Sequence, residues 1–254
     1  VIAYKELRKL EHRILGRLID LKAEETGLFK LSRVKLDHFY GIEIDEWPAR
    51  IAETAMFMID RQCDLKLRER FGQAPERLPI QREAKIVVGN ALTLDWKSVM
   101  PLSGEVMVAG NPPFLGHATR SDAQALELRN VWGRDDISRL DYVTGWHAMS
   151  LRYLAQHPDS RFAFVSTNSI TQGDPVPHLF APVFDGGWRI RFAHRTFPWQ
   201  SDATGKAAVH CVIVGFDRVA SRGATLYESG ALAEPGPHVV DEINGYLVAG
   251  PRVF

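Results

Sequence analysis

The sequence predicts an α/β fold, in which a mostly parallel β-sheet is covered by helices on both faces. The first observation is that short apolar stretches alternate with segments of helical periodicity, the pattern of βαβ units. The second is composition, since 45% hydrophobic and 24% charged residues are typical of a globular protein. The third is length, because 254 residues suffice for one large domain, alone or with an appendage.

The first half of the chain predicts two helices and two strands. Apolar residues at spacings of three and four predict one apolar face on the first helix, formed by Leu7, Leu10, Ile14, Leu18 and Leu21. DHFYGIEID is predicted to be a strand up to Asp45, and the next helix has Pro48 in its first turn. Its apolar face comprises Ile51, Ala55, Met56 and Ile59. A polar connection over 73–82 leads to the strand KIVVGN, which we expect to be buried.

The second half continues with further strands and one helix. GEVMVAG, RFAFVSTNS, WRIRFAHRTF and AAVHCVIVGF are predicted strands, and a helix runs from Leu140 to Leu154. After Asp217 the chain becomes rich in Gly and Pro, so we expect a linker or the start of another domain there, outside the sheet. The predicted boundaries are therefore 1–217 for the main domain and 218–254 for the appended part.

Charge and cysteine content exclude several classes of protein. Lys+Arg and Asp+Glu are equal at 31 each, which argues against a dedicated polyanion-binding module. It does not argue against an enzyme whose DNA contacts lie partly in another region of the protein. No apolar run is long enough for a membrane span, and we expect no signal peptide. Cys63 and Cys211 are isolated, so we expect no zinc site or disulfide framework and a reducing cytoplasm.

Polar residues end two of the early strands. Ligands of α/β sheets bind at the carboxyl ends of strands, where an acidic residue can bind ribose hydroxyls. Glu43 is the candidate for that role, Ile44 could pack against an adenine ring, and Asp45 could cap the next helix. Asn90 could hydrogen-bond an adenine edge. The alternatives are that the two acids only end a strand and start a helix, and that Asn90 is a turn residue.

The strand GEVMVAG ends in Asn111, Pro112, Pro113 and Phe114. The side-chain carbonyl of Asn111 and the backbone carbonyl of Pro112 can accept the two hydrogens of an exocyclic amine. Holding both hydrogens favours a pyramidal nitrogen whose lone pair is free to attack, and it stabilises the positive charge that develops. Phe114 can stack on the planar base. The chemistry needs no metal. The alternative is a turn that ends the strand.

The order of these motifs resembles a known family. NPPF after GIEID and GNALTLDW resembles the N6-adenine DNA methyltransferases that use S-adenosylmethionine. GNPPFLGH, FAFVSTNSITQG, HRTFPWQSDATGKAAVHCVIVGF and INGYLVAGPRVF resemble the MmeI-type restriction–modification enzymes, which join a nuclease, a methyltransferase and a target-recognition domain. The resemblance covers nearly the whole chain. It implies a Rossmann-like class I methyltransferase sheet and cytoplasmic location in a bacterium.

The resemblance implies roles for matching positions. Glu43 would bind the cofactor ribose, Ile44 would contact its adenine, and Asn90, where the family often has Asp, would hydrogen-bond that adenine. Asn111, Pro112, Pro113 and Phe114 would form the catalytic pocket for an adenine flipped out of double-stranded DNA. Phe197 is a weaker candidate for a second aromatic wall.

One departure concerns the start of the sequence. The family has a Gly-rich cofactor loop directly before the first helix, whereas this sequence begins with VIAYKELRKLE. We therefore expect a fragment that lacks the first strand and the Gly-rich loop, binds cofactor poorly and is itself inactive. Residues 1–217 would then be the truncated catalytic domain, and 218–254 the start of the target-recognition domain.

Several weaker patterns have more than one interpretation. His117 and Arg120 either contact DNA phosphates or lie on a solvated loop, and Gln200 and Lys206 lie in a candidate substrate loop. The basic run Arg189, Arg191, His194 and Arg195 either touches the DNA backbone or, as we prefer, forms a solvated face. His147 is expected to be a core histidine with a satisfied ring.

Three functions stay open. The preferred hypothesis is methylation of the N6 amine of adenine in DNA. A second is methylation of another amine, such as a glutamine side chain or an RNA base. A third is a binding or scaffold module with a degenerate site.

Overall fold

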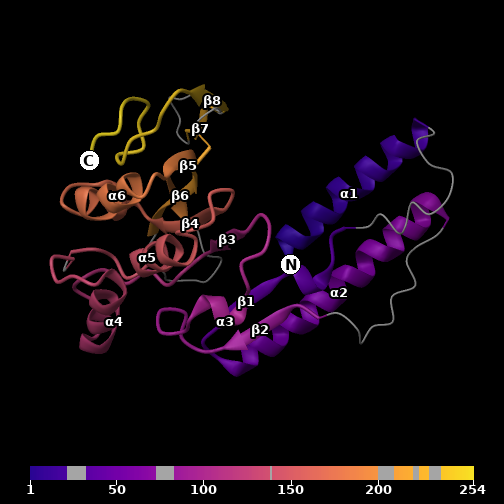
Figure 1. The fold of residues 1–254 in the computed structure, drawn as a ribbon, viewed down its shortest axis with the longest axis horizontal. Helices are drawn as coiled ribbons and strands as arrows, with labels where there is room; N and C mark the ends of the chain where they lie inside the picture. The colour runs from indigo at the N-terminus through magenta and orange to yellow at the C-terminus, as the bar shows by residue number, and fades with distance from the viewer. Residues whose placement is uncertain (22–32, 73–82, 138, 200–208, 220–222, 229–235) are drawn as a thin grey trace. The chain divides into compact units, whose positions relative to one another are not determined.

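The computed structural model describes residues 1–21, 33–72, 83–137, 139–199, 209–219, 223–228 and 236–254. The chain forms two compact units, Val1–Pro101 and Leu102–Phe254 (Figure 1). The connection predicted over 73–82, and Gln200 and Lys206, lie outside the described residues.

The first unit combines two long helices with a two-stranded sheet. Its elements are α1 (Ile2–Asp20), η2 (Leu36–His38), β1 (Tyr40–Glu43), α2 (Glu46–Phe71), β2 (Lys85–Val88) and α3 (Trp96–Val99). Strands β1 and β2 are parallel, with Glu43 in register with Val88. The backbone N–H of Gly89 donates to the carbonyl of Glu43 at 2.8 Å, which extends the pairing to the strand ends. β2 is only half-buried within this unit, contrary to the expectation of a buried strand.

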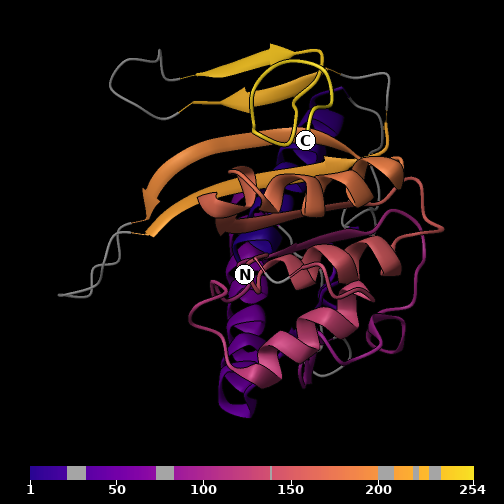
Figure 2. The same cartoon turned by 90° about the vertical axis from the view of Figure 1, so that its left-hand side faces the viewer.

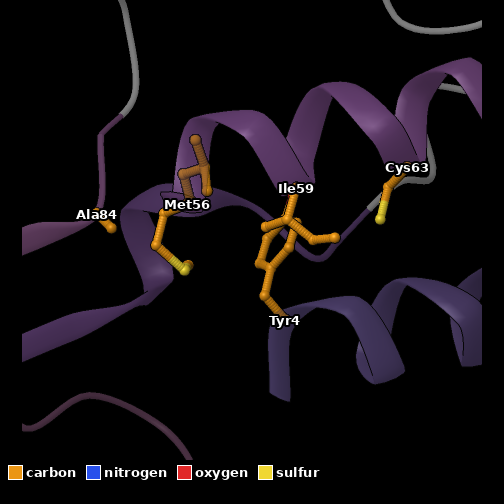
Figure 3. Packing of buried hydrophobic residues seen from close by; sticks show 6 residues of the cluster. Tyr4, Met56, Ile59, Cys63 and Ala84 are labelled. Carbon is orange, nitrogen blue, oxygen red and sulfur yellow. The ribbon is translucent and has the colours of Figure 1, made fainter. Parts of the chain in front are cut away.

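The apolar core of this unit lies between α1, α2 and the start of β2. It contains Tyr4, Leu36, Met56, Ile59, Cys63 and Ala84 (Figure 3). The predicted inward positions of Met56 and Ile59 on α2 are confirmed, whereas Ile51 is 54% exposed. The buried stripe of α2 follows Ala49, Met56 and Cys63, and Ile51 lies off that stripe because each residue turns the helix by about 100°.

Helix α1 buries a different face from the one that its leucines predict. Leu7, Leu10 and Ile14 are 43%, 49% and 51% exposed, whereas Arg8 is fully buried. Arg8 donates to Asp64 on α2 at 2.7 Å and to Asp60 at 3.1 Å. The physical reason is that buried charges need opposite charges as partners, so the ion pairs between α1 and α2 decide which face is turned inward.

The second unit is built on a six-stranded sheet of order β3-β4-β6-β5-β7-β8. The strands are β3 (Met107–Gly110), β4 (Arg161–Thr167), β5 (Arg189–Trp199), β6 (Val209–Asp217), β7 (Ala224–Tyr227) and β8 (Pro237–Val240). The helices are α4 (Asp122–Trp132), α5 (Thr144–Tyr153), η3 (Asn168–Thr171) and α6 (Pro175–Asp185). Figure 2 shows the later strands of this sheet side by side.

The α/β class is confirmed, but the sheet is mixed and not mostly parallel. β3–β4 and β5–β7 are parallel pairs, whereas β6 is antiparallel to both β4 and β5, and β8 is antiparallel to β7. Only residues 200–208 separate β5 from β6. Such a connection is too short for a parallel crossover, which needs about a dozen residues or more.

Helices α5 and α6 pack against one face of this sheet. Burial alternates along β4, so Phe162 and Phe164 face the interior while the opposite side chains are half-buried. The ring of His147 on α5 contacts both of these rings. The ring centroid of Phe180 on α6 lies 6.4 Å from that of Phe216 on the same face. The expectation that helices cover both faces is therefore not met by α5 and α6 within this unit.

Two described strands after Asp217 belong to the sheet, so the expectation that this part of the chain lies outside the sheet is wrong. β7 pairs with β5 through Phe192 and Thr225, and β8 extends the sheet by one strand. Ile243 and Leu247 are 2% exposed. The open edge of β5 explains this addition, because an unpaired strand edge is satisfied when another strand binds to it, whatever the Gly and Pro content of the neighbouring turns.

His147 is a core histidine, as expected, but only one of its ring nitrogens has a partner. The ring is fully buried among Phe162, Phe164 and Phe216. Nδ1 lies 3.3 Å from the carbonyl of Val143, and Nε2 has no hydrogen-bond partner among the described residues. Burial lowers the pKa of His147 to about 4.

This histidine predicts a loss of stability in acid. The unfolded chain takes up a proton below its ordinary pKa of 6.5, whereas the folded ring stays neutral down to about 4, so the unfolded state gains stability as the pH falls. Between pH 7 and pH 5 the protein should lose about 2 kcal/mol more unfolding free energy than the His147→Phe variant. Denaturant titrations of both proteins at the two pH values measure this difference, because carboxylate titration is common to both. Equal losses would contradict the prediction.

Candidate active site

In the first unit, Glu43 ends β1 and is half-buried. Its Oε1 accepts from the backbone N–H of Ile44 at 2.9 Å, and Glu43 forms no ion pair with any of the described residues. Ile44 is 64% exposed. Asp45 occupies the N-cap position of α2, as predicted, although its side chain makes no capping hydrogen bond. An acidic side chain and an exposed apolar side chain therefore lie together at the strand end.

Asn90 follows β2 and takes part in a turn. Its side-chain Oδ1 accepts from the N–H of Leu92 at 2.9 Å, and its backbone carbonyl accepts from Leu94 at 3.0 Å. The turn that sequence reasoning offered as the alternative is thus present. Because Oδ1 is engaged by Leu92, a hydrogen bond from Asn90 to an adenine nitrogen would come from Nδ2, the donor end of the amide.

The pairing of β1 and β2 brings these residues to one edge. Glu43 is in register with Val88, the last residue of β2, and Asn90 follows Val88 by two residues. A carboxylate suits a pair of ribose hydroxyls, and an amide suits the edge of a purine. The side chains at this edge therefore fit a nucleoside.

In the second unit, the NPPF segment leaves β3 at the carboxyl end of the strand. Gly110 is in register with Phe164 of β4, so the segment begins where the pairing stops. Asn111 and Pro113 are exposed, Pro112 is buried, and Phe114 is half-buried. The arrangement puts the Asn111 amide within reach of solvent while the Pro112 ring fixes the backbone behind it.

The residues after NPPF are attached to Asp141, which sequence reasoning did not single out. The N–H of Leu115 donates to Oδ1 of Asp141 at 3.1 Å, and the carbonyl of Leu115 accepts from Tyr142 N–H at 3.0 Å. Asp141 is only 5% exposed. Asp141 falls inside the helix predicted from Leu140 to Leu154, whereas α5 begins only at Thr144, so no local signal marked this residue.

His117 and Arg120 lie in the turn that follows. His117 is exposed. Arg120 donates from Nη1 to the carbonyl of Leu140, and desolvation lowers its pKa while the charge of Asp141 raises it. Arg120 is thus partly committed to the protein interior, which neither the DNA-phosphate nor the solvated-loop interpretation anticipated.

Phe197 lies at the same sheet edge as NPPF but on a distant strand. It is in register with Cys211 of β6, which is in register with Thr167 at the end of β4. β4 and β6 therefore separate β3 from β5. At about 4.8 Å per strand, the two backbones are roughly 14 Å apart, so a single base between Phe114 and Phe197 would require both side chains to reach across the edge.

The basic run on β5 is largely paired within the protein, and the preferred interpretation of a solvated face is wrong for its first residue. Arg189 is buried and donates to Asp217 at 2.7 Å. Arg195 pairs with Glu228 at 2.7 Å, and the ring of His194 stacks on Tyr227 at 4.2 Å. These acids lie on β6 or follow β7, which the sequence could not place beside β5.

Metal ligands and membrane spans are not found in the described part of the chain. No group of three or more His, Cys, Asp or Glu residues is arranged there to hold a metal ion. Cys63 and Cys211 are both buried and free. None of the described helices combines the length and the apolar character that a bilayer crossing requires.

Comparisons with known proteins identify the family of this chain. Residues 1–228 match the family described as MmeI, DNA-methyltransferase domain. DNA methyltransferase A of Bacillus subtilis (strain 168) is 32% identical over 258 residues, which cover 100% of this chain and 28% of that protein. The solved structure of the Type IIL restriction–modification enzyme MmeI in complex with DNA matches with a TM-score of 0.88 and 38% identity, covering 99% of this chain and 34% of that one.

The fold and these matches define a Rossmann-like α/β methyltransferase domain. The chain belongs to the MmeI DNA-methyltransferase domain family. It spans about a third or less of the length of the two relatives named above.

Proposed function

We propose that this chain transfers a methyl group from S-adenosylmethionine to the N6 amine of an adenine in specific double-stranded DNA, as part of a restriction–modification enzyme. The observation that carries the proposal is the NPPF segment at the carboxyl end of β3, with Asn111 exposed and Pro112 buried behind it. Membership of a DNA-methyltransferase family supports the reaction class, and the DNA complex of MmeI supports the substrate class.

Asn111 and Pro112 act on the target amine. An exocyclic amine is a poor nucleophile because its lone pair is delocalised into the base. The Asn111 Oδ1 and the Pro112 carbonyl each accept one of its hydrogens, which draws the nitrogen towards a pyramidal geometry. The same two oxygens stabilise the positive charge that grows on nitrogen as the methyl group arrives. The excess proton is lost afterwards to water or a nearby group.

Phe114 holds the base. A base stacked within the duplex cannot reach a pocket at a strand end, so the adenine must be flipped out, at a cost on the order of a few kcal/mol. Stacking on the Phe114 ring offsets part of this cost and orients the amine towards Asn111. Phe197, His117 and Arg120 remain proposed contacts, the first to the base and the other two to DNA phosphates.

Glu43, Ile44 and Asn90 hold the methyl donor. S-adenosylmethionine supplies an electrophilic sulfonium methyl group when bound. Glu43 would accept hydrogen bonds from its ribose hydroxyls, Ile44 would cover one face of its adenine, and Asn90 would bind the edge of that ring. The side chains found at the ends of β1 and β2 fit these tasks.

The remaining partners are further parts of the same protein. We propose that a nuclease and a target-recognition domain complete the polypeptide, and that the protein acts in the bacterial cytoplasm.

Nucleoside mass spectrometry tests the proposal. The complete protein that contains this sequence is incubated with unmethylated bacterial DNA and S-adenosylmethionine, and the DNA is digested to nucleosides. We expect N6-methyladenine, which should be absent when S-adenosylmethionine is omitted. Methylation of protein or RNA instead would favour the second hypothesis. No product, together with no calorimetric binding of S-adenosylmethionine, would favour the scaffold.

A further inference from the structure

Asp141 is a buried carboxylate for which the proposed reaction gives no role. Its Oδ1 accepts from the N–H groups of Leu115 and Val143, both at 3.1 Å, and its Oδ2 accepts from Thr167 Oγ1 at 3.1 Å. Within the described ranges it forms no ion pair. A buried carboxylate is costly unless its oxygens are hydrogen-bonded, so these contacts are strongly maintained in the folded state.

The three hydrogen bonds join three separate segments. Leu115 directly follows NPPF, Val143 precedes α5, and Thr167 is the last residue of β4. The carbonyl of Leu115 also accepts from Tyr142. Both backbone polar groups of Leu115 are therefore held by the short segment Asp141–Tyr142.

The NPPF segment depends on such external anchors. Pro112 and Pro113 have no N–H group, so these two residues cannot donate a backbone hydrogen bond that would fix the segment. Its first end is held by the pairing of Gly110 with β4. Its other end is held by Leu115. Thr167 is the last residue of β4, so the hydrogen bond from Thr167 to Asp141 connects this second end to β4 as well. Both ends of the segment are therefore attached to the same strand.

We propose that Asp141 is the positioning residue of the catalytic segment, and that it sets the place of Phe114 and Asn111 by anchoring Leu115. The proposal rests on the methyl-transfer function inferred above for NPPF. Asp141 acts through Leu115 and makes no contact with the target amine. Its importance follows from geometry, because a displacement of about 1 Å at a reacting group can lower a rate by about 100-fold.

The test compares Asp141→Ala with Asp141→Asn in the complete protein. The asparagine Oδ1 can still accept from Leu115 and Val143, and its Nδ2 can donate to Thr167, whose hydroxyl can turn to accept. Alanine removes all three contacts. We expect Asp141→Ala to lower the single-turnover methylation rate by about 10- to 100-fold, with the dissociation constant for S-adenosylmethionine unchanged. Asp141→Asn should restore most of that rate.

A matched core variant separates positioning from general destabilisation. Val183 is fully buried on α6 in the same unit, so Val183→Ala weakens the core without changing the anchor. At temperatures where all variants are folded, Val183→Ala should keep the wild-type rate. A wild-type rate in Asp141→Ala, or an Asp141→Asn variant as slow as Asp141→Ala, would overturn the proposal.

Hydrogen exchange gives a reading that does not require activity. Asp141→Ala should speed exchange of the Leu115 amide, whereas exchange along β6 should stay as in the wild type. If the wild-type protein methylates nothing, the proposed function fails while the anchor is still tested by this exchange. If the wild type is active and Leu115 exchange is unchanged in Asp141→Ala, the positioning role alone fails.

Discussion

Replacing Asn111 with alanine is expected to lower the rate of methyl transfer at least about 100-fold, the scale on which preorganised polar groups act in transition states. The variant loses one of the two carbonyl acceptors that hold the amine. Binding of S-adenosylmethionine should be unchanged, because Glu43, Ile44 and Asn90 belong to the first unit and Asn111 to the second. Single-turnover assays in the complete protein measure the rate, and calorimetry measures the binding.

Asn130→Ala is the matched control. Asn130 is an exposed asparagine on α4 in the same unit, and we assign it no part in the reaction. This variant should methylate DNA like the wild type. A normal rate in Asn111→Ala would remove Asn111 from the site. If Asn111→Ala also lost cofactor binding, the substitution would have disturbed the fold and not only the hydrogen bonds to the amine.

Replacing Arg8 with alanine is expected to destabilise the first unit by about 3–5 kcal/mol, the usual effect of removing one partner of a buried ion pair. Arg8 is fully buried and contacts Asp60, Asp64 and Glu11. Its loss leaves several carboxylates near one another without their shared cation. Tyr4 donates to Asp60 in the same cluster, and burial together with this contact raises the pKa of Tyr4.

Hydrogen exchange of the α2 amides measures the stability that the first unit loses in Arg8→Ala. A local measurement is needed because the chain has two units. The amides of α2 should exchange faster in Arg8→Ala, and those of β4 and β6 in the second unit should not. Arg13→Ala is the control, because Arg13 is exposed on the same helix. A surface change of this kind is worth about 0.5 kcal/mol or less. Equal effects of the two substitutions would contradict a structural role for the cluster.

Most strands could be predicted because their signals are local. The six strands from β1 to β6 each overlap an apolar stretch that was predicted to be a strand. Helix α4 was missed although its start carries a capping box, in which Ser121 and Gln124 bond to each other's backbone N–H groups. Helix α6 was missed for a different reason, because Pro182 inside it argues against a helix.

The candidate site divides in the same way. Glu43, Asn90 and NPPF could be proposed as site residues because polar residues directly following apolar strands are visible along the chain. Asp141 was not found, because it is 26 residues from Leu115 and nothing local to either residue indicates their contact. The basic run on β5 was misjudged for the same reason, since its acidic partners Asp217 and Glu228 come later in the chain.

The sequence by itself determined the α/β class, the strand ends and the residue types that could bind a nucleoside and an amine. These depend on the periodicity of side chains and on the chemistry of individual groups. The tertiary structure alone decided which face of α1 is buried, how β7 and β8 extend the sheet and which carboxylate holds the NPPF segment. Each of these depends on pairing between distant residues, where burial makes charges and backbone polar groups seek partners that no short stretch of sequence contains.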